Sequence, residues 1–122
     1  MDKLAWKNCI TQACCDAGTY RECFDAVIDT LSDILERRDL VRQKFEDEGE
    51  VLIVKHTNKG GATNAEQNPL IRMLNDLNRD ALAYWRDLGL TPAGLKRIKE
   101  SALREQEKIS PLQEALSRLA GA

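Results

Sequence analysis

One segment of the chain contains the signals for a complete helix and for the start of the next one. Asn68 is followed by Pro69, and proline is favoured at the first helical position because no helical hydrogen bond is lost there. Gly89 follows the apolar pattern, and a left-handed glycine ends many helices. Thr91 and Pro92 then repeat the cap-and-proline start. The sequence therefore predicts a helix between Asn68 and Gly89 and a second helix after Thr91.

A second long apolar pattern lies upstream of this segment. Thr19 and Glu22 have the spacing of a capping box, which predicts a helix from there to about Asp47. The apolar steps alternate between three and four residues, as in a coiled-coil seam. Two matching seams so close in sequence predict two long helices that pack antiparallel. The predicted seam residues, in the core or at an oligomer interface, are Phe24, Val27, Leu31, Ile34, Arg38, Val41, Leu70, Leu74, Leu77, Tyr84, Trp85 and Leu88.

Arg38 places a positive charge inside the first seam. Such a charge either sets the register or pairs with an acid such as Asp76 or Asp80 on a neighbouring helix. The alternative is that the long side chain extends outwards to solvent. The sequence leaves both interpretations open.

The link between the two long helices has the pattern of a small β-hairpin. Residues 51–54 are a β-favouring run, and Asn58-Lys59-Gly60-Gly61 is a strong turn signal. The second strand is expected at 62–65. Because an isolated hairpin is marginally stable in water, we expect it to pack against a neighbouring subunit.

The predicted fold is mainly α: an antiparallel long-helix hairpin with a small β-hairpin at its tip and short terminal helices. We expect a homo-oligomer, because the long apolar stripes exceed what one helix pair needs to bury. The expected divisions are a short helix within 1–18, the helical hairpin and oligomerisation core at 19–90, and C-terminal helices at 91–122. Within 91–122, a first helix should end near Lys108 and another should start at Ser110-Pro111.

Composition excludes several classes of function. The net charge is −2, but residues 1–50 carry 7 basic and 12 acidic side chains, and residues 51–122 carry 11 and 8. A contact with DNA is therefore expected within residues 51–122. No apolar run is long enough to span a membrane, and the N-terminus lacks the apolar core of a signal peptide, so a cytoplasmic location is expected.

The residues offer no catalytic set, metal site or cofactor site. The only histidine is His56, which leaves no Ser/His/Asp or Cys/His arrangement. The four cysteines lack the spacing of zinc knuckles and are interpreted as reduced structural residues on helix faces, with a metal site or disulfide as the alternative. The acidic run Glu46, Asp47, Glu48 and Glu50 is interpreted as a solvated helix end rather than a cation site.

The order of several short motifs resembles one family of phage terminase small subunits. The matching pieces span about residues 20–99 and are Gly49, Gly60-Gly61, Asn68-Pro69, Leu88-Gly89-Leu90-Thr91-Pro92, Leu95, Arg97 and Ile98. The resemblance implies a subunit without catalytic activity that recognises the packaging site on viral double-stranded DNA. It also implies a large terminase subunit as partner, which holds the ATPase and nuclease. The location that it implies is the host bacterial cytoplasm.

Two basic groups are the candidates for DNA contact. The first follows Pro92 and contains Lys96, Arg97, Lys99 and Arg104, with Lys108 beyond them; the second is Lys55, His56 and Lys59 in the predicted hairpin. Lysine and arginine contact phosphates and make binding depend on salt. The other interpretation of the charge pattern is an oligomeric coiled-coil adaptor that binds only protein.

Overall fold

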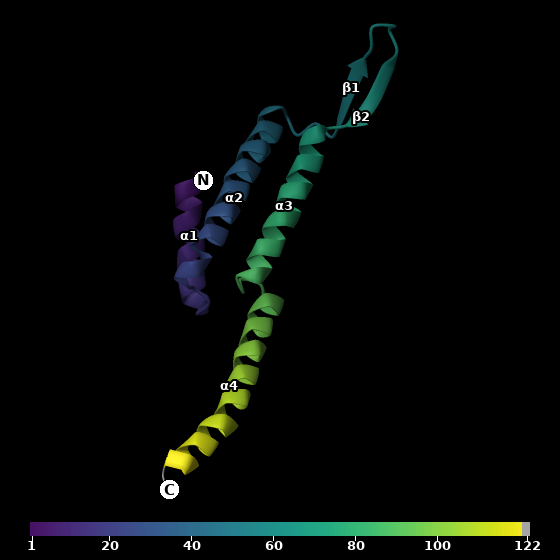
Figure 1. Ribbon diagram of the computed structural model, residues 1–122. Helices are drawn as coiled ribbons and strands as arrows, with labels where there is room; N and C mark the ends of the chain where they lie inside the picture. The colour runs from purple at the N-terminus through teal and green to yellow at the C-terminus, as the bar shows by residue number, and fades with distance from the viewer. Residues whose placement is uncertain (121–122) are drawn as a thin grey trace.

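The computed structural model describes residues 1–120, except for the side chains of residues 108–110. Helices α1, α2 and α3 form a bundle, and the β-hairpin and helix α4 project from its opposite ends (Figure 1). The elements in chain order are α1 (Lys3–Ala17), a 3₁₀ turn η1 (Glu22–Phe24), α2 (Asp25–Asp47), β1 (Ile53–Thr57), β2 (Thr63–Gln67), α3 (Pro69–Asp87) and α4 (Pro92–Ala120).

Helices α2 and α3 run antiparallel and pack along their apolar stripes (Figure 1), which confirms the predicted helical pair. Two clusters form the core: one around Leu31 and Ala81, and a second of Val41, Leu74 and Leu77 towards the hairpin end. Every predicted seam residue is buried or half-buried within this one chain. The seam is therefore occupied by the chain's own helices.

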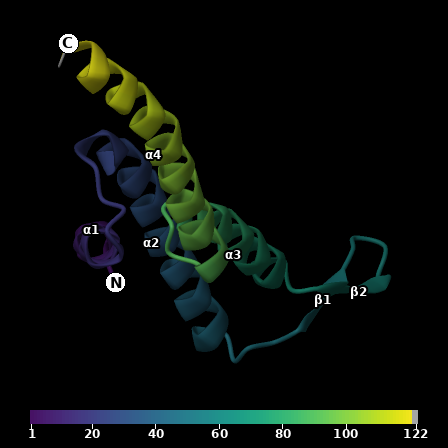
Figure 2. The same ribbon diagram turned by 90° about the horizontal axis from the view of Figure 1, so that it is seen from below.

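Helix α1 packs against α2 on a different side from α3, as the end-on view of α1 in Figure 2 shows. Ile10 and Cys14 of α1 are fully buried there, together with Ile28 and Leu35 of α2. Helix α2 thus buries two faces, which explains why its apolar pattern is wider than one seam. The cysteines of the described residues are free thiols, and burial raises the pKa of Cys14.

The predicted capping box at Thr19 and Glu22 is wrong. Gly18 ends α1 in the left-handed conformation, with a φ of 75°, and the Thr19 N–H donates to the Cys14 carbonyl at 2.9 Å. Thr19 therefore closes α1 instead of opening the next helix. The chain then makes the short η1 turn, and α2 begins only at Asp25, without a side-chain cap.

Polar contacts fix α1 along α2. Lys3 Nζ lies 3.1 Å from an oxygen of Asp29 and 3.2 Å from one of Asp33. Hydrogen bonds from Lys3, with a further contribution from Lys7, hold the pKa of Asp29 below its ordinary value. Partial burial opposes ionisation of Asp39. The carboxylate accepts hydrogen bonds from the N-terminal amine, Trp6 and Arg38, which outweigh this effect and lower the pKa of Asp39.

Arg38 pairs within α2 and with α1, and neither Asp76 nor Asp80 is its partner. Its guanidinium lies 3.0 Å from an Asp39 oxygen and 5.4 Å from the centre of the Trp6 ring. Cation–π contact and a shared carboxylate therefore hold this charge at the α1–α2 junction. Of the alternatives that the sequence left open, pairing with an acid of the neighbouring long helix is not observed: the acid is Asp39 of α2 itself, and α1 adds the Trp6 ring.

We expect acid to loosen α1 before it loosens α3. An aspartate with a lowered pKa in the folded state stabilises the fold above its unfolded pKa of about 3.9, and this contribution is lost as the pH falls through the folded value. Amide hydrogen exchange in α1 should therefore accelerate below about pH 4, after correction for the intrinsic pH dependence. Exchange in α3 is the internal control, and equal acceleration in both helices would contradict the prediction.

The β-hairpin is present, with strands later in sequence than expected. Strands β1 and β2 are antiparallel, with Ile53 opposite Gln67 and Thr57 opposite Thr63. The turn is closed by the Asn58 side chain, which accepts from the N–H groups of Gly60 and Ala62, both at 3.0 Å. These bonds start the turn at Asn58 and so extend β1 through Thr57, beyond the apolar run.

Asn68 joins the hairpin to α3. Its side-chain oxygen accepts from the Leu70 N–H at 3.1 Å, which confirms the predicted cap. Its amide nitrogen donates to the Val51 carbonyl at 2.8 Å, and its backbone N–H donates to the Leu52 carbonyl at 2.8 Å. One buried side chain thus closes both the base of the hairpin and the first turn of the helix.

Helix α4 is continuous from Pro92 to Ala120 and contains Pro111, so the predicted division at Ser110-Pro111 is wrong. Proline removes one backbone donor and crowds the preceding turn, which can kink a helix without ending it. Figure 1 shows α4 curving towards its C-terminus. The proposed cap itself, the Ser110 side chain, lies outside the described atoms.

Candidate nucleic-acid interface

A tight corner between α3 and α4 sets the direction in which α4 leaves the bundle. The buried Leu88 is followed by Gly89 in the left-handed conformation, with a φ of 74°, and the Leu90 N–H donates to the Trp85 carbonyl at 2.8 Å. The Thr91 hydroxyl oxygen accepts from the Gly94 N–H at 3.0 Å, so Thr91 caps α4 as predicted.

Two glycines allow the helices to meet at this corner. A Cβ at Gly94 would lie 2.1 Å from the Arg86 carbonyl oxygen, and a Cβ at Gly89 would lie 2.7 Å from the Ile98 side chain. The backbone of the first turn of α4 therefore rests on the last turn of α3. The Leu-Gly-Leu-Thr-Pro segment thus determines the direction of α4.

The structure places the first basic group on the exposed surface of α4 just beyond the corner. Lys96, Arg97, Lys99 and Arg104 are all exposed. Lys96 lies 4.0 Å from Glu100, and within the described residues the other three have no ion pair. Arg97 and Arg104 are seven residues apart, nearly two helical turns, and so share one side of α4. The Lys108 side chain is outside the described atoms.

The second basic group is divided by the strand geometry. Lys55 and His56 are consecutive in β1, so their side chains point to opposite faces of the hairpin. His56 lies 3.8 Å from Glu66 on the partner strand, and Lys59 lies in the turn. The hairpin and α4 extend from opposite ends of the bundle (Figure 1), so the two basic groups do not form one patch.

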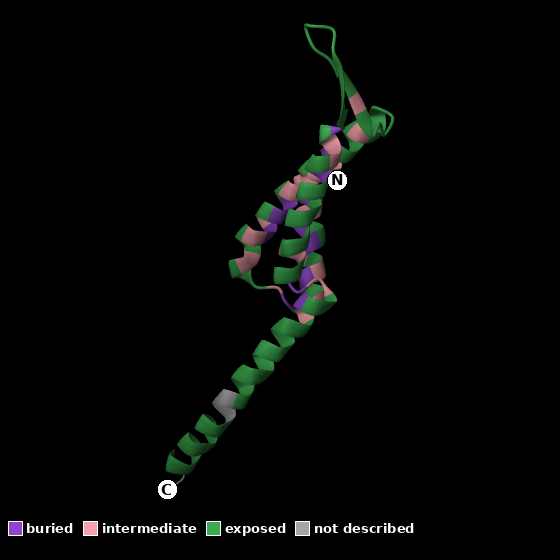
Figure 3. Cartoon of the chain, turned by 90° about the vertical axis from the view of Figure 1, so that its right-hand side faces the viewer, coloured by how far each residue is buried: buried purple, intermediate pink, exposed green. Residues whose placement is uncertain are grey.

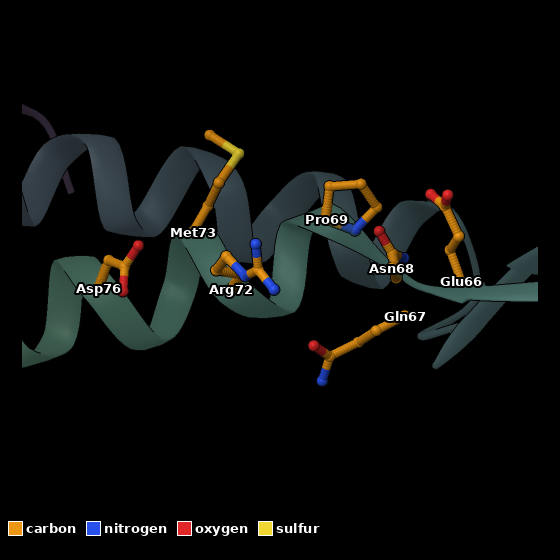
Figure 4. Close-up of a pocket in the computed structure, with 7 residues that line it drawn as sticks. All are labelled: Glu66, Gln67, Asn68, Pro69, Arg72, Met73 and Asp76. Atoms are coloured by element: carbon orange, nitrogen blue, oxygen red, sulfur yellow. The ribbon is translucent and has the colours of Figure 1, made fainter.

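A hollow of about 570 Å³ lies where the hairpin meets α3 (Figure 4). It includes Arg72, which is not among the cations predicted to contact DNA. Its place in the first turns of the helix after Asn68 follows from the sequence. Glu66 and Asp76 line the same hollow. This balance of charge does not favour an anion such as a phosphate.

Comparison of the chain with known protein families shows the family to which it belongs. The family described as phage terminase, small subunit, matches residues 3–105, from α1 through the corner and into α4. The chain belongs to this family. Terminase small subunits recognise the packaging DNA, work with the large subunit and are not the catalytic component. No curated protein and no solved structure gives a significant match.

The match includes more of the chain than the motifs quoted from the sequence. It takes in α1, whose packing on α2 completes the bundle, and the four basic residues after Pro92. It stops at residue 105, so the second half of α4 lies beyond it. Among the described residues, no helix has the length and apolar character to cross a membrane. No three potential metal-binding side chains gather in that same stretch of the chain.

Proposed function

We propose that this terminase small subunit contacts packaging DNA through the basic side of the first turns of α4. Arg97 and Arg104 would contact phosphates about 10 Å apart along the helix axis. Lys96 lies about 100° from Arg97 around the helix, and Lys99 lies on nearly the opposite side of it. The observation that carries the proposal is a group of exposed cations of which, in the described chain, only Lys96 forms an ion pair. Unpaired cations bind phosphate at less cost because no internal ion pair has to break.

The hairpin supports the same role less well. Its two adjacent cations face opposite ways, and one of them already lies near Glu66. A duplex resting on either face would meet only some of the basic group.

We further propose that the protein acts as a homo-oligomer in the host bacterial cytoplasm, with double-stranded phage DNA and the large terminase subunit as partners. One copy offers only a few phosphate contacts, which implies weak binding and a salt slope of only about 0.9 for each contact. Several copies that present the same surface would raise the overall affinity through effective concentration.

Replacing Arg97 and Arg104 with glutamine should weaken DNA binding roughly tenfold or more and flatten its salt dependence. Each lost phosphate contact lowers the slope of log K against log salt by about 0.9, so two contacts lower it by about 1.8. Fluorescence anisotropy with a duplex from the phage's own packaging region, over a series of salt concentrations, measures both quantities.

The matched control is the Arg37→Gln, Arg42→Gln variant, because both residues are exposed on α2 and the charge change is equal. An equal loss of binding in this control would assign the effect to net charge alone. A larger loss in a Lys55→Gln, Lys59→Gln variant would move the DNA surface to the hairpin. A wild-type chain that never binds DNA would support the protein-only adaptor.

A further inference from the structure

Helix α4 carries an apolar stripe that, beyond the corner, nothing else in the described chain covers. Leu95 is half-buried at the corner, and Ile98, Leu112, Leu116 and Leu119 are exposed. Figure 3 shows α4 as exposed where it extends beyond the bundle. A long helix with exposed leucines gains most of its stability from packing of its apolar face. This stripe therefore requires a partner.

The spacing of the stripe is that of a coiled coil. Its steps alternate between three and four residues, which keeps one side of the helix facing a partner helix over several turns. The positions are 95, 98, 102, 105, 109, 112, 116 and 119. Two of them are unusual, because Ala102 is small and Glu105 is charged. Pro111 lies outside the stripe and does not obstruct it.

The residues that flank the stripe are suited to a second copy of the same helix. Like charges at these flanking positions would repel an identical partner. The flanking positions beyond the corner hold Lys99, Ser101, Gln106, Lys108, Gln113, Ala115 and Ala120, of which only two are charged. The acids Glu100, Glu107 and Glu114 repeat every seven residues and lie on the opposite side of α4. The stripe and its flanks therefore carry only three charged residues, Lys99, Glu105 and Lys108, which limits the repulsion between two copies.

We propose that α4 pairs with α4 of a second copy in an antiparallel coiled coil. A parallel pair would place Glu105 against Glu105 and the small Ala102 against Ala102. An antiparallel pair places Ala102 across from Leu112, a small residue against a large one, as close packing requires. It also brings Ile98 across from Leu116 without shifting the register, and it separates the two Glu105 carboxylates.

This inference rests on the proposed homo-oligomer and names its interface, much of which lies beyond the family match. Because α4 projects from the bundle (Figure 3), two copies can pair without opening either core. The basic residues Arg97 and Arg104 lie away from the stripe and stay exposed in the pair. DNA binding is measured separately, so failure of the interface is distinguishable from failure of the DNA surface.

The first test is the mass in solution of the full chain and of Leu116→Glu, by light scattering after size exclusion without DNA. The wild type should be at least a dimer, and Leu116→Glu should dissociate at least tenfold more readily. Leu103→Glu is the matched control, because Leu103 and Leu116 are both 58% exposed and Leu103 lies outside the stripe. A monomeric wild type, or equal dissociation in both variants, would overturn the proposal.

The second test determines the direction of the pair by cross-linking. Ala102→Cys and Leu112→Cys are made separately, with Cys9, Cys15 and Cys23 replaced by serine because these thiols are exposed. A short bis-maleimide linker should join the two variants only when they are mixed, since copies of residue 102 lie about 15 Å apart along an antiparallel pair. Linkage within each variant alone would show a parallel pair and overturn the proposal.

Discussion

Gly94→Ala is expected to displace α4 from its position at the end of the bundle. The added Cβ would lie 2.1 Å from the Arg86 carbonyl oxygen, and that atom belongs to the backbone of α3, which cannot turn aside as a side chain does. We expect a loss of about 1–3 kcal/mol, the usual cost of overpacking. Because α4 contributes little to the core, the corner should open while the three-helix bundle stays folded.

Hydrogen exchange is the measurement for this variant. The Leu90 and Leu95 N–H groups, which donate to the Trp85 and Thr91 carbonyls at the corner, should exchange faster. Gly60→Ala is the control, because its Cβ would meet only the Asn58 side chain at 3.4 Å. Native protection at the corner in Gly94→Ala would show that the two backbones do not touch as described.

Leu31→Ala is expected to cost about 2–5 kcal/mol of unfolding free energy, the range for a large buried residue that leaves a cavity. Leu31 is fully buried in the cluster that joins α2 to its neighbours. A loss of this size is a large fraction of the total stability of a small domain. Urea unfolding followed by circular dichroism measures the change.

Leu40→Ala on the same helix is the matched control, because Leu40 is 66% exposed and its truncation removes little buried surface. It should change stability by less than about 0.5 kcal/mol. If Leu40→Ala costs as much as Leu31→Ala, then the exposed side of α2 is covered in solution, and the expected oligomer uses that side as well.

The elements of the fold that could be predicted are those whose signals are local. Asn68-Pro69 and Thr91-Pro92 begin helices because a cap and the fixed φ of proline act within one turn, and both caps are present. Thr19 has an equally good local signal, but its N–H is used by the Cys14 carbonyl of α1. A capping pattern shows that a residue can cap a helix end. It does not show which of two adjacent helices the residue caps.

The sequence left the contacts of Arg38 open, and the predicted division of α4 at Pro111 is wrong. The contact of Arg38 with the Trp6 ring depends on where α1 packs, and the weak apolar pattern of α1 does not give that direction. Pro111 follows a residue suited to capping, yet the helix continues through it, since a proline costs one hydrogen bond and a bend. In each case the structure depends on residues outside the short sequence segment on which the interpretation was based.

The candidate site divides in the same way. The basic residues after Pro92 and in the hairpin could be selected from the sequence, because lysine, arginine and histidine are identified by residue type alone. The distance between the two basic groups could not be predicted, because it depends on the corner at Gly89 and Gly94 that directs α4 away from the hairpin. Strand alternation alone would have shown that Lys55 and His56 face opposite sides.

Helix α3 acts as a spacer of fixed length between two appendages. Its 19 residues separate the base of the hairpin, held by Asn68, from the corner that holds α4. At about 1.5 Å per residue this distance is roughly 28 Å, and a helix does not shorten under small loads. A partner bound at the hairpin and another bound at α4 would therefore be held at a constant separation, and each end would remain accessible while the other is occupied.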